Sequence, residues 1–177
     1  MKSRVILLVG ESGSGKSELE NSLRELGFNC IESYTTREPR FKGERGHKFV
    51  DKATYDHTID IVAETIFDNN YYWTTQADFT QEGTSIYIVD IQGVKDCIIN
   101  LPTDTEIYTV YLKTSTITRL NRMTEQGRSY EDIIRRLRHD EISFKPRKYM
   151  EFDKVIDANK CKDLVLIDML QFIRRLG

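Results

Sequence analysis

The chain has 177 residues, of which 39% are hydrophobic and 31% charged, and its formal net charge is −2. This balance predicts one folded globular domain and excludes a disordered chain, while the near-neutral charge excludes a basic surface built for nucleic acid. The first apolar run, 5–9, is too short to span a membrane and lacks a signal-peptide cleavage site. Three widely separated cysteines fit free thiols in a reducing compartment and offer no zinc site. We therefore expect a cytoplasmic protein with no membrane or nucleic-acid partner.

Strand-like and helix-like runs alternate along most of the chain, which predicts a three-layer α/β fold with a parallel sheet. The expected core strands are 4–9, 28–31, 85–89, 106–112 and 154–156. The expected later helices are 93–99, 116–125, 131–144 and 162–174. An earlier helix follows the first strand, because Leu19, Leu23 and Leu26 fall on one helical face before Gly27 ends it.

Two segments do not follow this alternation. Residues 33–84 are rich in Thr, Tyr, Asp, Gln and Asn, and we interpret them as a subdomain inserted between core elements. An arginine-rich stretch at about 119–136 has the composition of a lid that closes over a binding site. The remaining core would then comprise 1–32, 85–118 and 137–177.

The first predicted strand leads into a glycine-rich segment. Residues 10–17 read Gly-Glu-Ser-Gly-Ser-Gly-Lys-Ser and fit the pattern G-x-x-x-x-G-K-[ST] at every fixed position. Glycines let successive backbone N–H groups curl around phosphate oxygens, and the following helix adds partial positive charge. The residues expected to bind a nucleoside triphosphate are Gly10, Ser12, Gly13, Ser14, Gly15, Lys16 and Ser17. Glu18, which follows the motif, is not counted among them. Lys16 would reach the β- and γ-phosphates, and the Ser17 hydroxyl would ligate Mg²⁺.

Further blocks occur in one order over nearly the whole chain. They are Ser33 with Thr35-Thr36-Arg37-Glu38-Pro39-Arg40, then Gly43-Glu44, Phe49-Val50, Glu64, Tyr71-Tyr72-Trp73-Thr74, Asp90-Ile91-Gln92-Gly93, Arg119-Leu120, Arg136-Leu137 and Asp153-Lys154-Val155-Ile156. This series resembles the guanylate kinases. The resemblance implies a phosphate-loop kinase fold with an inserted subdomain that binds an acceptor nucleotide.

The resemblance implies an acceptor-phosphate site at Arg37, Arg40, His47 and Tyr72. Two guanidinium groups three residues apart can grip one phosphate in a bidentate way, which lysines could not copy. His47 stands where the family usually has Tyr, and we expect a bound phosphate to raise its pKa and favour the protonated ring. Taken alone, Arg37 and Arg40 also fit a solvated basic turn.

The acceptor base is assigned by the same resemblance to Glu64, Asp90, Ser33 and Thr74. Guanine presents N1–H and N2–H₂ donors on one edge, which suits the two carboxylates, and the hydroxyls would serve O6 or N7. Without the resemblance, Glu64 fits a solvated helix residue and Asp90 a cap at a strand end.

Arg119 and Arg136 resemble the lid and catalytic arginines of the family, which neutralise charge on the transferred phosphoryl group. The third arginine of this region is either Arg122 or Arg128, and on a bare helix each would be a surface charge. Two other positions depart from the family pattern. Ile88 replaces a frequent acidic residue, and Ala158-Asn159 replaces Asn-Asp near the adenine pocket.

The sequence thus predicts a magnesium-dependent kinase that uses ATP to phosphorylate GMP or dGMP, acting as a monomer or small homo-oligomer. One alternative is a related kinase for another nucleotide or phosphate ester. Another is a non-catalytic peptide-binding module of the same fold, although such modules usually have a degraded phosphate loop.

Overall fold

The structure is a computed structural model that describes residues 3–79 and 83–177. Its core is a five-stranded parallel sheet in the order β2-β7-β1-β8-β9. The bounds are Arg4–Val9 for β1, Asn29–Cys30 for β2, Thr84–Val89 for β7, Glu106–Lys113 for β8 and Lys154–Asp157 for β9. The expected α/β fold with a parallel sheet is therefore confirmed, and each expected core strand is present within two residues of its predicted bounds.

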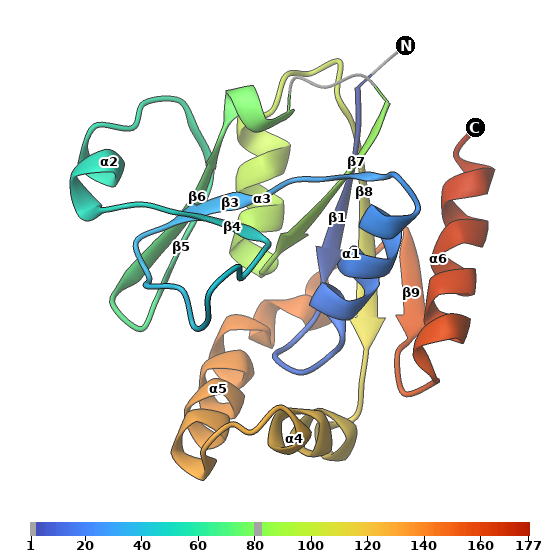
Figure 1. Ribbon diagram of the computed structural model, residues 1–177. Coiled ribbons are helices and arrows are strands. Elements are labelled where there is room, and N and C mark those ends of the chain that lie inside the picture. The colour runs from blue at the N-terminus through green and yellow to red at the C-terminus, as the bar shows by residue number, and fades with distance from the viewer. Residues whose placement is uncertain (1–2, 80–82) are drawn as a thin grey trace.

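Helices cover both faces of this sheet (Figure 1). The helix α3, Ile91–Asn100, packs on one face, while α1, Lys16–Glu25, and α6, Lys162–Arg175, pack on the other. Because side chains alternate along a strand, Val5 and Leu7 point toward α3, and Ile6 points toward α1 and α6. All of β1 from its second residue onward is buried, as a central parallel strand requires.

The apolar stripe expected on α1 is shorter than predicted. Leu19 and Leu23 are buried in the core as expected, but Leu26 is 56% exposed. The helix ends at Glu25, so Leu26 is its C-cap residue and lies beyond the packed face. The prediction for Leu26 was wrong because the stripe was extended one turn too far.

The inserted segment forms a second sheet beside α3, in the order β4-β3-β6-β5. Its elements are β3, Ser33–Thr35; β4, His47–Phe49; α2, Lys52–Asp56; β5, Ile61–Phe67; β6, Asn70–Thr75; and the short helix η1, Gln76–Phe79. The strand β5 packs directly against α3, so the second sheet is held beside the core.

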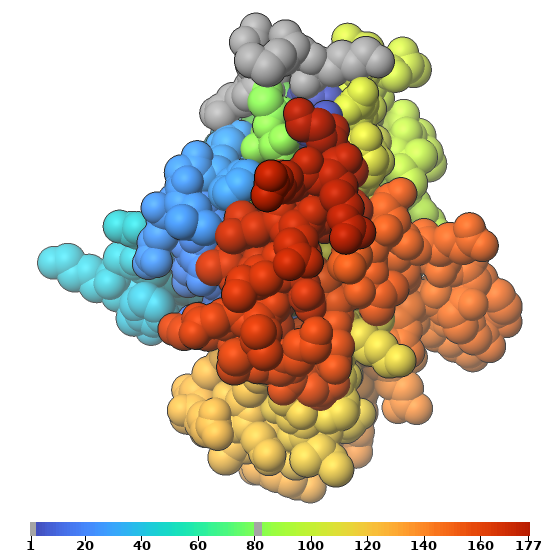
Figure 2. Space-filling model, turned by 90° about the vertical axis from the view of Figure 1, so that its right-hand side faces the viewer, coloured from blue at the N-terminus to red at the C-terminus, as the bar shows by residue number. Residues whose placement is uncertain are grey.

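Two further helices, α4 at Thr116–Glu125 and α5 at Tyr130–Ser143, lie beyond the carboxyl ends of the core strands (Figure 1). The short helix η2, Lys145–Tyr149, returns the chain to the core. Seen from the side of α6, this helix pair forms the lower part of the molecule (Figure 2). The expected lid, about 119–136, runs from within α4 to within α5, and its role stays a prediction. None of the helices in the described ranges has the length and hydropathy needed to cross a bilayer.

Candidate active site

The glycine-rich segment 10–17, here called the phosphate-binding loop, joins β1 to α1 as predicted. Gly13 and Gly15 have φ angles of +77° and +100°, which side chains rarely tolerate. A Cβ at Gly13 would also lie 2.9 Å from the Arg119 carbonyl oxygen. Glycine is therefore required at both positions by backbone conformation, and at Gly13 by the close approach of α4 as well.

Lys16 lies inside the curve of this loop. Its Nζ atom donates to the carbonyl oxygens of Gly10 and Glu11, the latter at 3.1 Å. Burial lowers the pKa of Lys16 to about 8. Ser14 Oγ is buried and has no hydrogen-bond partner among the described residues. The loop thus holds an amine and a buried hydroxyl beside the backbone amides.

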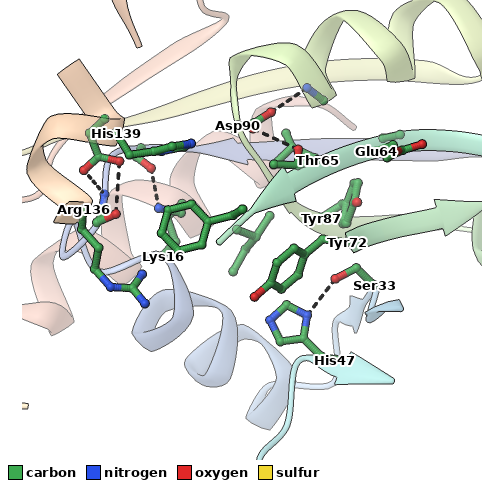
Figure 3. Close-up of a pocket in the computed structure, with 18 of the residues that line it drawn as sticks. Lys16, Ser33, His47, Glu64, Thr65, Tyr72, Tyr87, Asp90, Arg136 and His139 are labelled. Carbon is green, nitrogen blue, oxygen red and sulfur yellow. Dashed lines mark hydrogen bonds between the residues drawn. The ribbon is translucent and has the colours of Figure 1, made fainter. Parts of the chain in front are cut away.

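Two adjoining hollows open at the loop. A cavity of about 250 Å³ extends toward the second sheet, and a groove of about 610 Å³ runs along the loop and the start of α1. Ser12, Lys16, Arg40 and Arg136 line both hollows. In Figure 3, Lys16 and Arg136 lie on one side of the cavity, and Ser33, His47 and Tyr72 lie on the other. The arrangement brings two binding spaces together at a cluster of cationic groups.

The two carboxylates assigned to base recognition line the cavity. Glu64 on β5 accepts a hydrogen bond from the Tyr55 hydroxyl at 2.8 Å. Asp90 caps α3 by accepting from the Gly93 N–H at 2.7 Å, and it accepts from the Thr65 hydroxyl at 3.0 Å. Asp90 therefore caps a helix, as its alternative interpretation suggested, and also lines the cavity.

Ser33 also lines the cavity, as expected, but Thr74 does not. Thr74 is fully buried on β6 and donates to the Tyr87 hydroxyl at 3.3 Å. Tyr87, which accepts this bond, lines both cavity and groove. Sequence reasoning did not identify Tyr87, because a tyrosine within an apolar strand is indistinguishable from an ordinary core residue.

The acceptor loop, residues 36–46 between β3 and β4, carries the paired arginines. Arg40 lines both hollows, but Arg37 lines neither. The Arg37 guanidinium grips Glu44 with bonds of 2.8 and 3.2 Å and stacks over Phe49 at 5.3 Å. Both arginines thus lie beside the same carboxylate, with Arg37 held closely by Glu44 and Arg40 3.6 Å from it.

His47 faces the cavity beside Tyr72, with ring centres 5.4 Å apart. Its Nδ1 lies 2.8 Å from the Ser33 hydroxyl oxygen. Burial, followed by the charge of Arg37, lowers the pKa of His47 to about 4. Without ligand, His47 is therefore a neutral imidazole near neutral pH, and the expected rise of its pKa on binding phosphate stays a prediction.

The arginines of α4 and α5 are placed differently from one another. Arg136 lines both hollows, pairs with Asp132 at 3.0 Å and stacks on Phe67 at 5.3 Å. Arg128 lines the groove. Arg119 lines neither hollow and is only 7% exposed.

Arg122 is turned toward the back of the phosphate-binding loop. It donates to the carbonyl oxygens of Ser14 at 3.1 Å and Ala158 at 2.8 Å. It also helps to line a third hollow of about 300 Å³, with Gly15, Ala158 and Lys160. Of the two candidates for the third arginine, Arg128 is thus the one that faces the groove.

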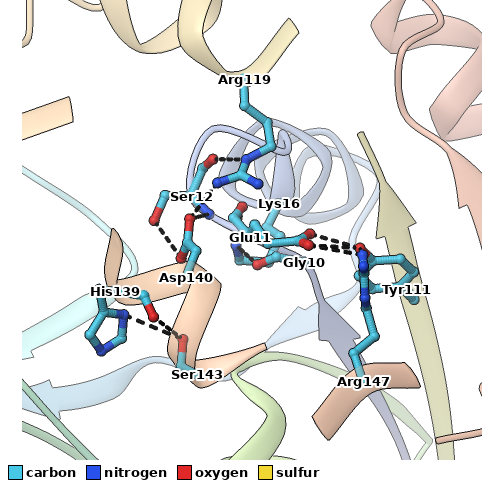
Figure 4. A network of polar contacts seen from close by, with 10 residues as sticks. All are labelled: Gly10, Glu11, Ser12, Lys16, Tyr111, Arg119, His139, Asp140, Ser143 and Arg147. Carbon is cyan, nitrogen blue, oxygen red and sulfur yellow. Dashed lines mark hydrogen bonds and ion pairs between the residues drawn. The ribbon is translucent and has the colours of Figure 1, made fainter. Parts of the chain in front are cut away.

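Several polar residues behind the loop were not predicted (Figure 4). Asp140 on α5 accepts from Ser12 and Arg119. Glu11 accepts from the Tyr111 hydroxyl at 2.8 Å and from Arg147 at 2.9 Å. These partners are separated by 21 to 136 residues, so no local sequence pattern announces them. Only the unusual acidic residue inside the glycine loop gave a hint.

Mg²⁺ fits the residues present. It is a hard cation that keeps several waters and takes few protein ligands beside phosphate oxygens. Ser17 lies exposed at the start of α1, on the groove, where its hydroxyl can serve as such a ligand. No cluster of three His, Cys, Asp or Glu side chains suited to a metal occurs within 3–79 and 83–177.

Comparison with known proteins agrees with this geometry. A family model described as guanylate kinase matches residues 2–174. Among solved structures, a guanylate kinase from Anaplasma phagocytophilum is similar with a TM-score of 0.68 and 20% identity, covering 98% of this chain and 86% of that chain. A gluconokinase from Sinorhizobium meliloti 1021 is similar with a TM-score of 0.59 and 16% identity, covering 98% of this chain and 93% of that chain. No curated protein sequence matches the chain.

Proposed function

The chain belongs to the guanylate kinase family, and on that premise we propose that it transfers the terminal phosphoryl group of ATP to GMP or dGMP. The products would be ADP and GDP or dGDP. The observation that carries the proposal is the junction of the two hollows at Lys16, Arg40 and Arg136. One hollow runs along a phosphate-binding loop, and the other ends at two carboxylates.

Phosphoryl transfer needs two anions brought into line and their charge neutralised, with little covalent help from the protein. The phosphate-binding loop would hold the donor phosphates through backbone N–H groups and Lys16. Arg40 would hold the acceptor phosphate, joined by Arg37 once that side chain turns from Glu44. Arg136, at the boundary of both hollows, would balance the charge that develops on the transferred group.

Glu64 and Asp90 favour guanine as the acceptor base, since both are hydrogen-bond acceptors that line the cavity. Ser33 adds a hydroxyl to the lining of the same cavity. His47 would act as a neutral donor or acceptor rather than as a cation. Its contact with Ser33 means that one ring nitrogen is already engaged, so the other would face the acceptor.

Ser17 would contribute a hydroxyl ligand to Mg²⁺, which would supply positive charge that polarises the phosphoryl group. The third hollow, beside Arg122 and Ala158, is the proposed place for the donor base. Free thiols at Cys30, Cys97 and Cys161 fit an enzyme of the cytoplasm, and we propose small-molecule partners and a monomer or small homo-oligomer.

A coupled ADP-release assay over the common ribo- and deoxynucleoside monophosphates tests this function. We expect turnover with GMP or dGMP to exceed turnover with AMP, CMP and UMP by at least about a hundredfold, since a site that binds donors rejects bases lacking them. Equal turnover with all of them, or release of ADP without any acceptor, would contradict the guanine assignment.

A kinase for a different phosphate acceptor is the second candidate. It is favoured by the similarity of the fold to a gluconokinase, whose name indicates a sugar-acid acceptor. Gluconate in the same assay panel separates the two candidates. A third candidate, a non-catalytic peptide-binding module, is weakened by the intact glycines, Lys16 and Ser17 of the phosphate-binding loop, and it predicts no ADP release with any acceptor.

A further inference from the structure

The carbonyl oxygens of the phosphate-binding loop are turned toward cationic side chains. Lys16 donates to the carbonyls of Gly10 and Glu11. Arg119 Nε donates to the Ser12 carbonyl at 2.9 Å, and Arg122 Nη1 donates to the Ser14 carbonyl at 3.1 Å. Both arginines come from α4, so this one helix holds two peptide groups of the loop from behind.

The peptide groups on both sides of Ser12 belong to a closed ring of contacts (Figure 4). Asp140 Oδ2 accepts from the Ser12 N–H at 2.9 Å and from Arg119 Nη2 at 2.6 Å, while Asp140 Oδ1 accepts from the Ser12 hydroxyl at 3.1 Å. Arg119 returns to the Ser12 carbonyl. Because Arg119 and Asp140 are 7% and 5% exposed, water competes little for these bonds.

These contacts fix the direction of particular N–H groups. In a planar trans peptide, the C=O of one residue and the N–H of the next point in opposite directions, and the described residues contain no cis peptide. Holding the Ser12 carbonyl toward Arg119 therefore turns the Gly13 N–H away from α4. Holding the Ser14 carbonyl toward Arg122 does the same for the Gly15 N–H.

We propose that Arg119, Arg122 and Asp140 form a clamp that orients the peptide groups of the phosphate-binding loop, so that the N–H groups of Gly13 and Gly15 face the donor phosphates. The inference rests on the proposed function, because it takes the loop to bind a nucleoside phosphate. It makes Arg119 and Arg122 positioning residues that act through the backbone. Charge on the transferred group is left to Arg136 and Arg128, which line the groove.

The ADP affinity of the Asp140→Asn variant distinguishes two roles for Arg119. Arg119 either orients the loop as part of the clamp or contacts phosphate directly. If the clamp is correct, the loss of the carboxylate loosens Arg119 and Ser12, and the ADP dissociation constant rises about tenfold. If Arg119 touches phosphate directly, removing a neighbouring negative charge frees it, and ADP binds as well or more tightly. Glu141→Gln, at an exposed position on the same helix, is the control that should leave the constant unchanged.

A double-mutant cycle then tests whether the groups act together. Arg119→Gln should weaken ADP binding about as much as Asp140→Asn, and the double variant should be little worse than either single variant. Additive losses would overturn the clamp. ADP is the useful probe, since an arginine that touches only the transferred phosphoryl group would lower kcat without changing ADP affinity.

The amide signals of Gly13 and Gly15 in isotope-labelled free protein provide a readout that needs no ligand. Asp140→Asn should move the Gly13 signal most, and Arg122→Gln, at a half-buried position, should move the Gly15 signal most. Unmoved glycine signals in folded variants would overturn the clamp. If the wild-type protein binds no ADP, the proposed function fails, and the glycine signals still decide the clamp. If Asp140→Asn does not fold, Arg122→Gln carries the test through Gly15.

Discussion

Arginines lie beside both the phosphate-binding loop and the acceptor loop, but their side chains are placed in opposite ways. Behind the phosphate-binding loop, Arg119 is buried, and its partner Asp140 lies 2.6 Å away with side chains 8% and 6% exposed. In the acceptor loop, the Arg40 side chain is 45% exposed and lies 3.6 Å from Glu44. The first loop presents backbone amides that buried charges hold in place, whereas the second presents the guanidinium groups themselves.

This difference has an energetic meaning. A preorganised site spends little free energy on ordering when its ligand arrives, while a site whose side chains must change partners spends more. Arg37 is gripped by Glu44, which also accepts from the Arg40 N–H at 2.7 Å. On the proposed function, the donor site would be ordered before its ligand binds, and the acceptor site would be completed during binding.

The comparison predicts the largest loss of activity at the phosphate-binding loop. Lys16→Ala removes the amine that lies inside the loop and should lower kcat by about a hundred- to a thousandfold, because one charge-stabilising donor is lost from the transition state. Steady-state kinetics measures this, with Lys95→Ala at an exposed position of α3 as the control. Near-normal turnover of a folded Lys16→Ala protein would contradict the proposed mechanism of phosphoryl transfer.

A change in the acceptor loop should act on the acceptor alone. Arg40→Ala should weaken GMP binding by roughly 2–4 kcal/mol, since a charge-assisted contact to phosphate is lost, and should leave ATP affinity nearly unchanged. Calorimetry with each nucleotide checks this, and Lys42→Ala at an exposed position of the same loop is the matched control. Equal losses for both nucleotides would show that the two loops do not serve separate ligands.

Base choice should change less than affinity for phosphate. Glu64→Gln keeps an oxygen for the Tyr55 hydroxyl but places an N–H₂ group where guanine also has donors. We expect the preference for GMP over AMP, taken as the ratio of kcat/KM values, to fall about tenfold. Glu151→Gln, exposed near β9, should not alter that ratio. If Glu64→Gln leaves the preference for GMP over AMP unchanged, Glu64 on β5 does not recognise the base.

The smallest expected effect concerns pH and His47. The pKa is 6.5 for an unperturbed histidine and about 4 for His47 in the folded protein, so the unfolded chain binds more protons between these values. Folding stability from this residue is therefore present above about pH 6.5 and is lost as the pH falls toward 4.

The expected change is on the order of 1 kcal/mol, and urea unfolding at several pH values measures it. Glu20 opposes this trend, because burial raises its pKa to about 7. The informative quantity is therefore the difference between wild type and His47→Gln, with exposed His57→Gln as the control. Parallel stability curves for wild type and His47→Gln would contradict the lowered pKa.

The core could be predicted from sequence because its signals are local. The alternation of apolar runs placed β1 at Arg4–Val9 and α4 at Thr116–Glu125 with the bounds that the structure shows. Strands that are apolar on both faces are typical of a parallel sheet covered by helices, so the pairing of the core strands in such a sheet could also be predicted. Leu26 shows the limit, since periodicity alone does not say where a helix ends.

The site could be predicted only where a motif is continuous. The glycine-rich segment joins β1 to α1, and Arg40, Glu64 and Asp90 line one cavity, while their roles stay predictions. Asp140 escaped prediction because its partner Ser12 is 128 residues away. The state of His47 escaped because burial and the charge of Arg37 are properties of the folded chain.

The central claim is that this chain moves a phosphoryl group from ATP to a guanine nucleotide. The most direct test follows a radiolabelled terminal phosphoryl group after mixing labelled ATP, GMP, Mg²⁺ and protein, and separates the products. We expect labelled GDP, formed about a hundred- to a thousandfold more slowly by Lys16→Ala. Label appearing only as inorganic phosphate, or remaining in ATP while a different acceptor such as gluconate becomes labelled in a parallel reaction, would contradict it.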